Sequence, residues 1–122
     1  LLIDRSNNAK AIASMAKLSD FVKSKNLSIW IWPEGTRSMD GKLIPFKKGF
    51  VHLALETGLP VVPVMLHGAH EVWPAKTMQF YPGNVEVEVL DPIETDKWSK
   101  DTVDNHVEHV KSIMAKSLAQ RN

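Results

Sequence analysis

The sequence predicts an α/β protein in which helices flank a layered sheet. Short β-rich apolar runs alternate along the chain with longer segments whose apolar residues recur at helical spacing, and turn residues separate the two kinds of segment. Hydrophobic residues make up 43% and charged residues 24% of the 122 residues, a composition that is typical of a globular domain and excludes intrinsic disorder. The length indicates one domain or part of one.

Three segments have the periodicity of amphipathic helices. In the first, residues 9–24, apolar residues follow one another at steps of four, three and four: Ala11, Met15, Leu18 and Val22. The second begins at Lys47 or Lys48, runs to residue 57 and ends at Gly58, which favours a left-handed stop. In the third, near the C-terminus, the apolar residues are Val103, Val107, Val110, Met114 and Leu118.

Four strands are predicted, at residues 1–3, 28–32, 61–66 and 85–89. Residues 28–32 are apolar on both faces, which favours a central strand that is covered on both sides and places Trp30 and Trp32 in the core. Pro63 has no amide hydrogen, so a bulge or an unpaired position is expected there. Residues 85–89 alternate valine and glutamate, as in a half-exposed strand. Residues 34–46 and 68–83 are predicted to be loops.

The formal net charge is only +1, which argues against a nucleic-acid partner, because such domains carry a basic excess. The charge is uneven, however. Residues 1–50 hold nine basic and four acidic residues, whereas residues 51–122 hold six basic and ten acidic ones. An anionic ligand is therefore expected in the first half, although a solvated face explains part of such an asymmetry.

The chain contains no cysteine, so it has no disulfide, no thiolate metal site and no cysteine nucleophile. No run approaches the roughly 20 apolar residues that span a bilayer. Trp73 and Trp98 lie near predicted loops, where partial burial is expected and a position at a membrane interface is the alternative.

The segment Trp32-Pro33-Glu34-Gly35-Thr36-Arg37-Ser38 is the strongest candidate for a binding site, because it follows the predicted central strand. Ligand sites in open α/β sheets lie beyond the carboxyl ends of strands. Glu34 could pair with Arg37 and orient its planar guanidinium, which suits a phosphate or a carboxylate. A strand–loop turn with an exposed ion pair explains the same residues, and their spacing alone does not decide between the two interpretations.

Three further features of the first half point to an anion. Arg5 follows an apparent strand, and Lys47 and Lys48 open a helix, where the helix dipole and unpaired amides favour negative charge. Gly49 leaves room for a ligand near the backbone. Each feature alone is an ordinary surface residue, but together with Arg37 they indicate a phosphate pocket.

The histidines do not provide a catalytic or metal site by themselves. His67, His70 and Glu71 have the donor types of a metal site, but local spacing is weak evidence, so no metal is predicted. His106 and His109 lie three residues apart on the last predicted helix and are expected to face solvent.

Several ordered blocks resemble the glycerolipid acyltransferases, in particular those that act on lysophosphatidate. They are Leu2-Ile3-Asp4-Arg5, Pro33-Glu34-Gly35-Thr36-Arg37-Ser38, Asp40-Gly41-Lys42 with Phe46-Lys47-Lys48-Gly49, and Val61-Val62-Pro63-Val64. The order and spacing of the blocks are far more specific than any one of them, and the resemblance covers about residues 1–90. It implies that residues 1–122 form a single partial acyltransferase domain, the C-terminal portion of a layered α/β fold.

The resemblance implies transfer of a fatty acyl group from acyl-CoA or acyl carrier protein to the free hydroxyl of lysophosphatidate, giving phosphatidate in phospholipid biosynthesis. It implies no cofactor beyond this acyl donor, and a membrane-associated enzyme on the cytoplasmic side that meets the membrane surface. Arg5 and Arg37 would hold the glycerol phosphate, and Lys47 is a candidate third cation. The implied substrate-binding residues are Arg5, Glu34, Gly35, Thr36, Arg37 and Lys47.

The sequence departs from the family at the catalytic block, His-x-x-x-x-Asp, in which the histidine is the general base and the aspartate orients its ring. None of the five histidines has an aspartate five positions on. The family block lies upstream of Leu2-Ile3-Asp4-Arg5, so the segment alone is expected to be inactive and the full-length protein to be an enzyme. Two alternatives stay open: a non-catalytic module that binds a phosphoryl group, and an acyltransferase for another glycerolipid acceptor.

Overall fold

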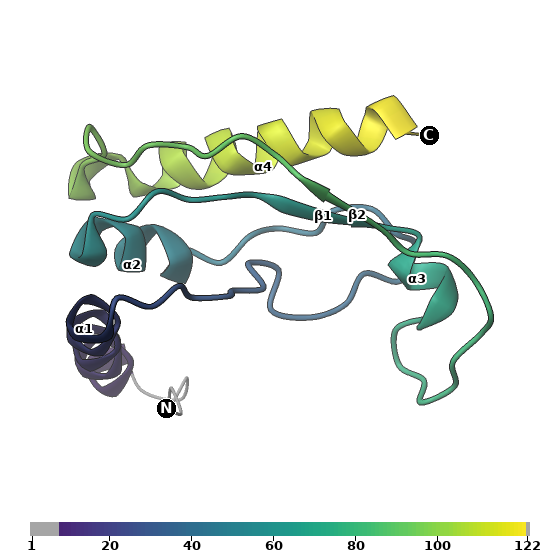
Figure 1. The fold of residues 1–122 in the computed structure, drawn as a ribbon, viewed down its shortest axis with the longest axis horizontal. Coiled ribbons are helices and arrows are strands. Elements are labelled where there is room, and N and C mark those ends of the chain that lie inside the picture. Colours follow the sequence, from purple (N-terminus) through teal and green to yellow (C-terminus); the bar gives the residue numbers. More distant parts are fainter. Residues whose placement is uncertain (1–7, 122) are drawn as a thin grey trace.

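The computed structural model describes residues 8–121 and confirms the α/β class. In Figure 1, α4 (Val103–Arg121) runs alongside the strands, α1 (Asn8–Lys25) and α2 (Gly49–Thr57) lie at one end of the molecule, and α3 (Ala69–Val72) with the loop after it forms the other end. None of these helices combines the length and the apolar composition that a bilayer crossing requires. The elements, in chain order, are α1 (Asn8–Lys25), α2 (Gly49–Thr57), β1 (Val64–His67), α3 (Ala69–Val72), β2 (Glu86–Val89), the 3-10 turn η1 (Lys100–Thr102) and α4 (Val103–Arg121).

The core forms around α2, which packs against α1 on one side and α4 on the other. Val51 of α2 is fully buried, with 0% of its surface exposed. Its neighbours in the buried cluster are Phe46, Phe50, Val107 and Val110. Gly58 ends α2 in the left-handed conformation (φ +68°) and donates its amide to the carbonyl of Ala54, as its position after the apolar stripe predicts.

β1 and β2 pair in an antiparallel register that aligns Val64 with Val89. On the N-terminal side of β1, the antiparallel pairing continues as an isolated bridge between Val61 and Ile93. Pro63 lies between these two paired regions, and its carbonyl accepts a hydrogen bond from the amide of Leu90 at 2.9 Å. The expected interruption at Pro63 is therefore confirmed, since proline cannot donate to the ladder.

Residues 28–32 do not form the predicted central strand. They are extended, but no strand among residues 8–121 pairs with them. Trp30 and Trp32 are 60% and 62% exposed and contact each other edge to face, so the prediction that they are core residues is wrong. An apolar run becomes a central strand only where neighbouring strands satisfy its amides and other elements cover its faces, and local sequence contains neither condition.

The three predicted helices are confirmed, unlike the strand at residues 28–32, because helical periodicity is a local property. α1, α2 and α4 cover the three segments that the apolar spacing predicted, with Val22, Val107 and Val110 buried. Residues 68–83 were predicted to be a loop, but this segment begins with the short helix α3. Because α3 has no buried residue, its sequence shows no apolar stripe from which a helix could be predicted.

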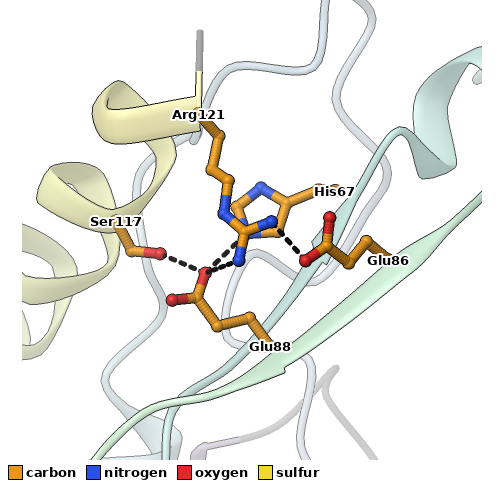
Figure 2. A network of polar contacts seen from close by, with 5 residues as sticks. All are labelled: His67, Glu86, Glu88, Ser117 and Arg121. Atoms are coloured by element: carbon orange, nitrogen blue, oxygen red, sulfur yellow. Dashed lines mark hydrogen bonds and ion pairs between the residues drawn. The ribbon is translucent and has the colours of Figure 1, made fainter.

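The glutamates of β2, rather than its valines, face α4. Glu88 accepts a hydrogen bond from the Ser117 hydroxyl at 2.7 Å and pairs with His67 of β1 at 2.8 Å (Figure 2). Arg121, near the end of α4, pairs with Glu86 and also lies 3.6 Å from the carboxylate of Glu88. These polar contacts attach the sheet to the last turns of α4, while Val87 and Val89 remain 59% and 66% exposed.

The Ser117 hydroxyl and the His67 ring lower the pKa of the Glu88 carboxyl from its ordinary value of 4.5, with a smaller contribution from the charge of Arg121. A carboxylate whose pKa is lowered by folding stabilises the folded state at pH values above its ordinary pKa. That stabilisation is lost as the pH falls through the lowered value.

The burial of Val51 predicts a large effect of truncation. Replacing Val51 with alanine removes two buried methyl groups and should lower the free energy of unfolding by about 1.5–3 kcal/mol. Val62→Ala, at a position that is 44% exposed, is the matched control and should change it by less than about 0.5 kcal/mol. Urea unfolding followed by circular dichroism measures both; equal effects would show that α2 is not the centre of the core.

The Glu88 network predicts a stability that depends on pH. Glu88→Gln removes the charge that Ser117, His67 and Arg121 stabilise, so the variant should be less stable than the parent at neutral pH. The two stabilities should converge as the pH falls through the lowered pKa and Glu88 of the folded parent is protonated. Urea unfolding over a pH series tests this, with Glu108→Gln on the exposed face of α4 as control. A difference that persists unchanged in acid would contradict the assignment.

Candidate functional site

The loop over residues 33–47 is closed at its base by backbone hydrogen bonds. The Lys47 amide donates to the Pro33 carbonyl at 2.7 Å, and the Gly35 amide donates to the Trp32 carbonyl at 3.1 Å. Proline at the second position of such a four-residue turn and glycine at the fourth are preferred in type I turns. Gly35 adopts φ +72°, a conformation that glycine allows without strain. The loop thus has a defined shape although it contains no helix or strand.

Glu34 stabilises this loop from within. One of its carboxylate oxygens accepts a hydrogen bond from the amide of Ile44 at 3.0 Å, and the side chain is partly buried. The predicted pairing of Glu34 with Arg37 is wrong, because this contact turns the carboxylate toward the backbone of the loop. The sequence identified an important residue here but assigned it the wrong partner.

An aromatic ring holds Arg37 instead. The guanidinium carbon lies 4.2 Å from the centre of a ring of Trp73, and Nη1 donates to the carbonyl of Pro74 at 3.1 Å. Trp73 is in turn packed against Phe80, with ring centres 4.8 Å apart. No carboxylate among residues 8–121 pairs with Arg37. The planar cation is therefore fixed in orientation without being neutralised.

An open hollow of about 420 Å³ lies beside Arg37, and we call it the Arg37 groove. Lys76 provides a second cation in its lining. Asp40 is also in the lining, but the Lys42 amide and the Ser38 hydroxyl donate to its carboxylate and lower its pKa. The groove is lined by Thr36, Arg37, Ser38, Met39, Asp40, Ile44, Ala75 and Lys76.

Close packing at Gly41 keeps the loop near α3. Gly41 has φ +77°, and a Cβ atom built there would lie 2.6 Å from Cε1 of the His70 ring. The positive φ favours glycine at this position, and the His70 ring would have to shift to make room for a larger residue. This contact and the stack of Arg37 on Trp73 join the loop over residues 33–47 to the segment after β1.

The structure brings together only some of the predicted substrate-binding residues. Thr36 and Arg37 line the groove, whereas Glu34 and Gly35 shape the loop that carries them. Lys47 contributes its amide to the base of the loop and its exposed side chain is not part of the groove lining. Arg5 lies outside the described residues.

The histidines form no metal site: within residues 8–121, no group of three or more metal-binding side chains comes together. His106 does not face solvent as predicted. Its ring stacks on Trp98 with centres 4.5 Å apart, and Nε2 lies 2.8 Å from the Thr102 hydroxyl. The apolar partner is contributed by the segment before α4, which the spacing of residues on the helix does not reveal.

The sequence did not identify the second wall of the groove. Trp73, Pro74 and Lys76 contact or line the site, yet they follow Arg37 by more than thirty positions and belong to no recognised pattern. The available signal in the sequence was weak: a tryptophan, a proline and a single lysine in a stretch without acidic residues.

Comparison with known proteins identifies the family. Residues 1–67 match the family described as Acyltransferase. The chain is 47% identical over 116 residues to a 1-acyl-sn-glycerol-3-phosphate acyltransferase of Limnanthes douglasii, covering 95% of this chain and 41% of the relative. It is 38% identical over 120 residues to the enzyme of the same name from Escherichia coli (strain K12), covering 98% of this chain and 48% of the relative.

A solved structure has the same fold. The crystal structure of the 1-acyl-sn-glycerophosphate (LPA) acyltransferase PlsC from Thermotoga maritima superimposes with a TM-score of 0.78 at 28% identity, covering 91% of this chain and 45% of that one. The chain thus spans less than half the length of the relatives that it matches. The family match over more than half of the chain, together with this shared fold, shows that the chain belongs to the Acyltransferase family.

Proposed function

We propose that the chain is the phosphate-binding part of an acyltransferase that transfers a fatty acyl group from acyl-CoA or acyl carrier protein to lysophosphatidate. The observation that carries the proposal is the un-neutralised guanidinium of Arg37, stacked on Trp73 at the edge of a groove. Relatives named 1-acyl-sn-glycerol-3-phosphate acyltransferases support the substrate class. The product is phosphatidate, which places the reaction in phospholipid biosynthesis.

The geometry of Arg37 suits a phosphate monoester. The Trp73 ring and the Pro74 carbonyl fix the plane of the guanidinium, so few conformations are lost when its N–H groups bind phosphate oxygens. Lys76 adds positive charge in the same groove. Arg5 and Lys47 are proposed as further cations for the glycerol phosphate, and Glu34, Gly35 and Thr36 as residues that shape its binding loop.

The acyl-transfer step needs a base that takes the proton of the acceptor hydroxyl as the oxygen attacks the thioester carbonyl; the carbon–sulfur bond then breaks, and the donor leaves as its free thiol with that proton. In the family resemblance this base is the histidine of His-x-x-x-x-Asp, which none of the 122 residues supplies. The proposal therefore treats the chain as a single partial domain whose catalytic residues are joined to it in a longer, membrane-associated protein that works on the cytoplasmic side. No metal ion takes part in this scheme.

Removal of the Arg37 side chain should weaken use of the phosphorylated acceptor. In a protein that joins this chain to the family's catalytic block, Arg37→Ala should lower kcat/KM for lysophosphatidate. The loss should correspond to about 1.5–3 kcal/mol of transition-state stabilisation, the range for charge-assisted hydrogen bonds. The thermal stability should fall only slightly, because the stack of Arg37 on Trp73 and its bond to Pro74 are exposed contacts, for which a cation–π pair contributes about 0.5–1 kcal/mol. Steady-state kinetics and thermal unfolding measure the two effects.

Two control variants sharpen this test. Arg37→Lys keeps the charge but loses the planar fork, so it should recover only part of the activity. Lys116→Ala removes an exposed cation on α4, far along the chain from the groove, and should leave kcat/KM unchanged. If Arg37→Ala keeps normal acceptor kinetics, Arg37 does not bind the phosphate.

The isolated chain should not turn over. A positioned general base contributes about 10²–10⁴ in rate, and the chain has no histidine–aspartate pair at the family's spacing. A thiol-release assay with acyl-CoA and lysophosphatidate, run beside the longer protein, measures this. Turnover within tenfold of the longer protein would overturn the division of roles. A longer protein that binds lysophosphatidate without turnover would instead support a non-catalytic anion-binding module.

A further inference from the structure

The loop after α3 is compact and projects from the end of the molecule away from α1 and α2 (Figure 1). Its two ends are joined by a hydrogen bond from the Tyr81 amide to the Val72 carbonyl at 2.8 Å. Inside the loop, the Trp73 indole donates to the Thr77 carbonyl at 2.9 Å, and the Gln79 amide donates to the Thr77 hydroxyl at 3.0 Å. We call residues 73–82 the aromatic loop. These internal bonds give the loop a defined shape.

The tip of the aromatic loop is strongly apolar and exposed. Met78 is 81% exposed, Phe80 63% and Tyr81 49%, and Trp73 at the base is 38% exposed. Isolated apolar side chains on a surface are ordinary, but a cluster on one projecting loop marks a contact surface. Aromatic residues with one polar end, such as tyrosine and tryptophan, favour the boundary between water and the acyl region of a bilayer.

The charges around this cluster fit a negatively charged partner. Between Glu71 and Glu86 the only charged residue is Lys76, so the loop carries no acidic group. Arg37 lies over the ring of Trp73 and adds a second cation beside the aromatic cluster. An apolar tip flanked by cations matches the profile of an anionic lipid surface, where phosphates lie above the acyl chains.

We propose that the aromatic loop inserts Met78, Phe80 and Tyr81 into the headgroup–acyl boundary of an anionic membrane. The inference rests on the proposed function and deepens it, because it names the surface through which the enzyme meets its lipid substrate. Lys76 belongs both to this loop and to the lining of the Arg37 groove. Insertion of the tip therefore holds the groove at the level of the lipid phosphates.

The absence of cysteine allows a direct test on the full 122-residue chain. Met78→Cys, labelled with the environment-sensitive fluorophore NBD, should show a blue shift and a gain in intensity on vesicles of phosphatidylcholine and phosphatidylglycerol. Nitroxide groups attached to the lipids should quench this emission. The matched control is Ile12→Cys, because Ile12 is 71% exposed on α1, and its label should show neither effect.

Second substitutions separate the apolar and the electrostatic contributions. With the label at position 78, Phe80→Gln should weaken vesicle affinity by about tenfold or more, whereas Phe21→Gln, on the exposed face of α1, should not change it. Lys76→Gln should weaken affinity for the anionic vesicles by about fivefold and leave affinity for pure phosphatidylcholine unchanged.

The label distinguishes this inference from the enzymatic proposal, because insertion is measured without turnover. Co-sedimentation with vesicles while the label at position 78 stays in water would overturn the loop as the contact surface, as would a chain that does not co-sediment. A spectral shift that depends on protein concentration in the absence of vesicles would also overturn it, in favour of a second copy of the chain. A longer protein, carrying the family's catalytic block, that inserts the label at position 78 into vesicles but does not acylate lysophosphatidate would instead contradict the proposed function alone.

Discussion

The burial of α2 between α1 and α4 is the constraint on which the remaining geometry depends. Each neighbour contributes an amphipathic stripe that cannot be buried alone, and Val51 of α2 is buried in one cluster with Val107 and Val110 of α4. Because α2 is only nine residues long, its stability comes from this packing rather than from helix propensity. The loop over residues 33–47 enters α2 directly, so the position of its closing hydrogen bond at Lys47 follows from the same core.

Arg37 illustrates how a fold can hold a charge without neutralising it. A carboxylate partner would orient the guanidinium but compete with an anionic ligand for its N–H groups. The Trp73 face and a neutral carbonyl orient the same group and leave its charge uncompensated by the described residues. Glu34, the nearby acid, is occupied by a backbone amide. Glu34 and Arg37 therefore have different roles because of the fold of the loop, and their spacing in the sequence does not reveal this.

The sequence predicted the parts of this protein that local periodicity determines. The helices α1, α2 and α4, the stop at Gly58 and the interruption at Pro63 each depend on nearby residues, and the structure confirms them. Residues 28–32 were mispredicted because strand formation depends on partners elsewhere. The site was predicted in part, since its loop and Arg37 were identified. Its second wall was missed, because Pro74 lies 37 positions after Arg37 and only the tertiary fold brings the two into contact.

The inverted alternation of β2 has a consequence for the behaviour of the chain at high concentration. With Glu86 and Glu88 turned toward α4, Val87 and Val89 form an apolar strip on the exposed face of the two-stranded sheet found within residues 8–121. A net charge of +1 gives copies of the chain little mutual repulsion at neutral pH. Contact between copies through this apolar face is therefore a route to precipitation, and charge placed on the valine side would suppress it without any change to the core.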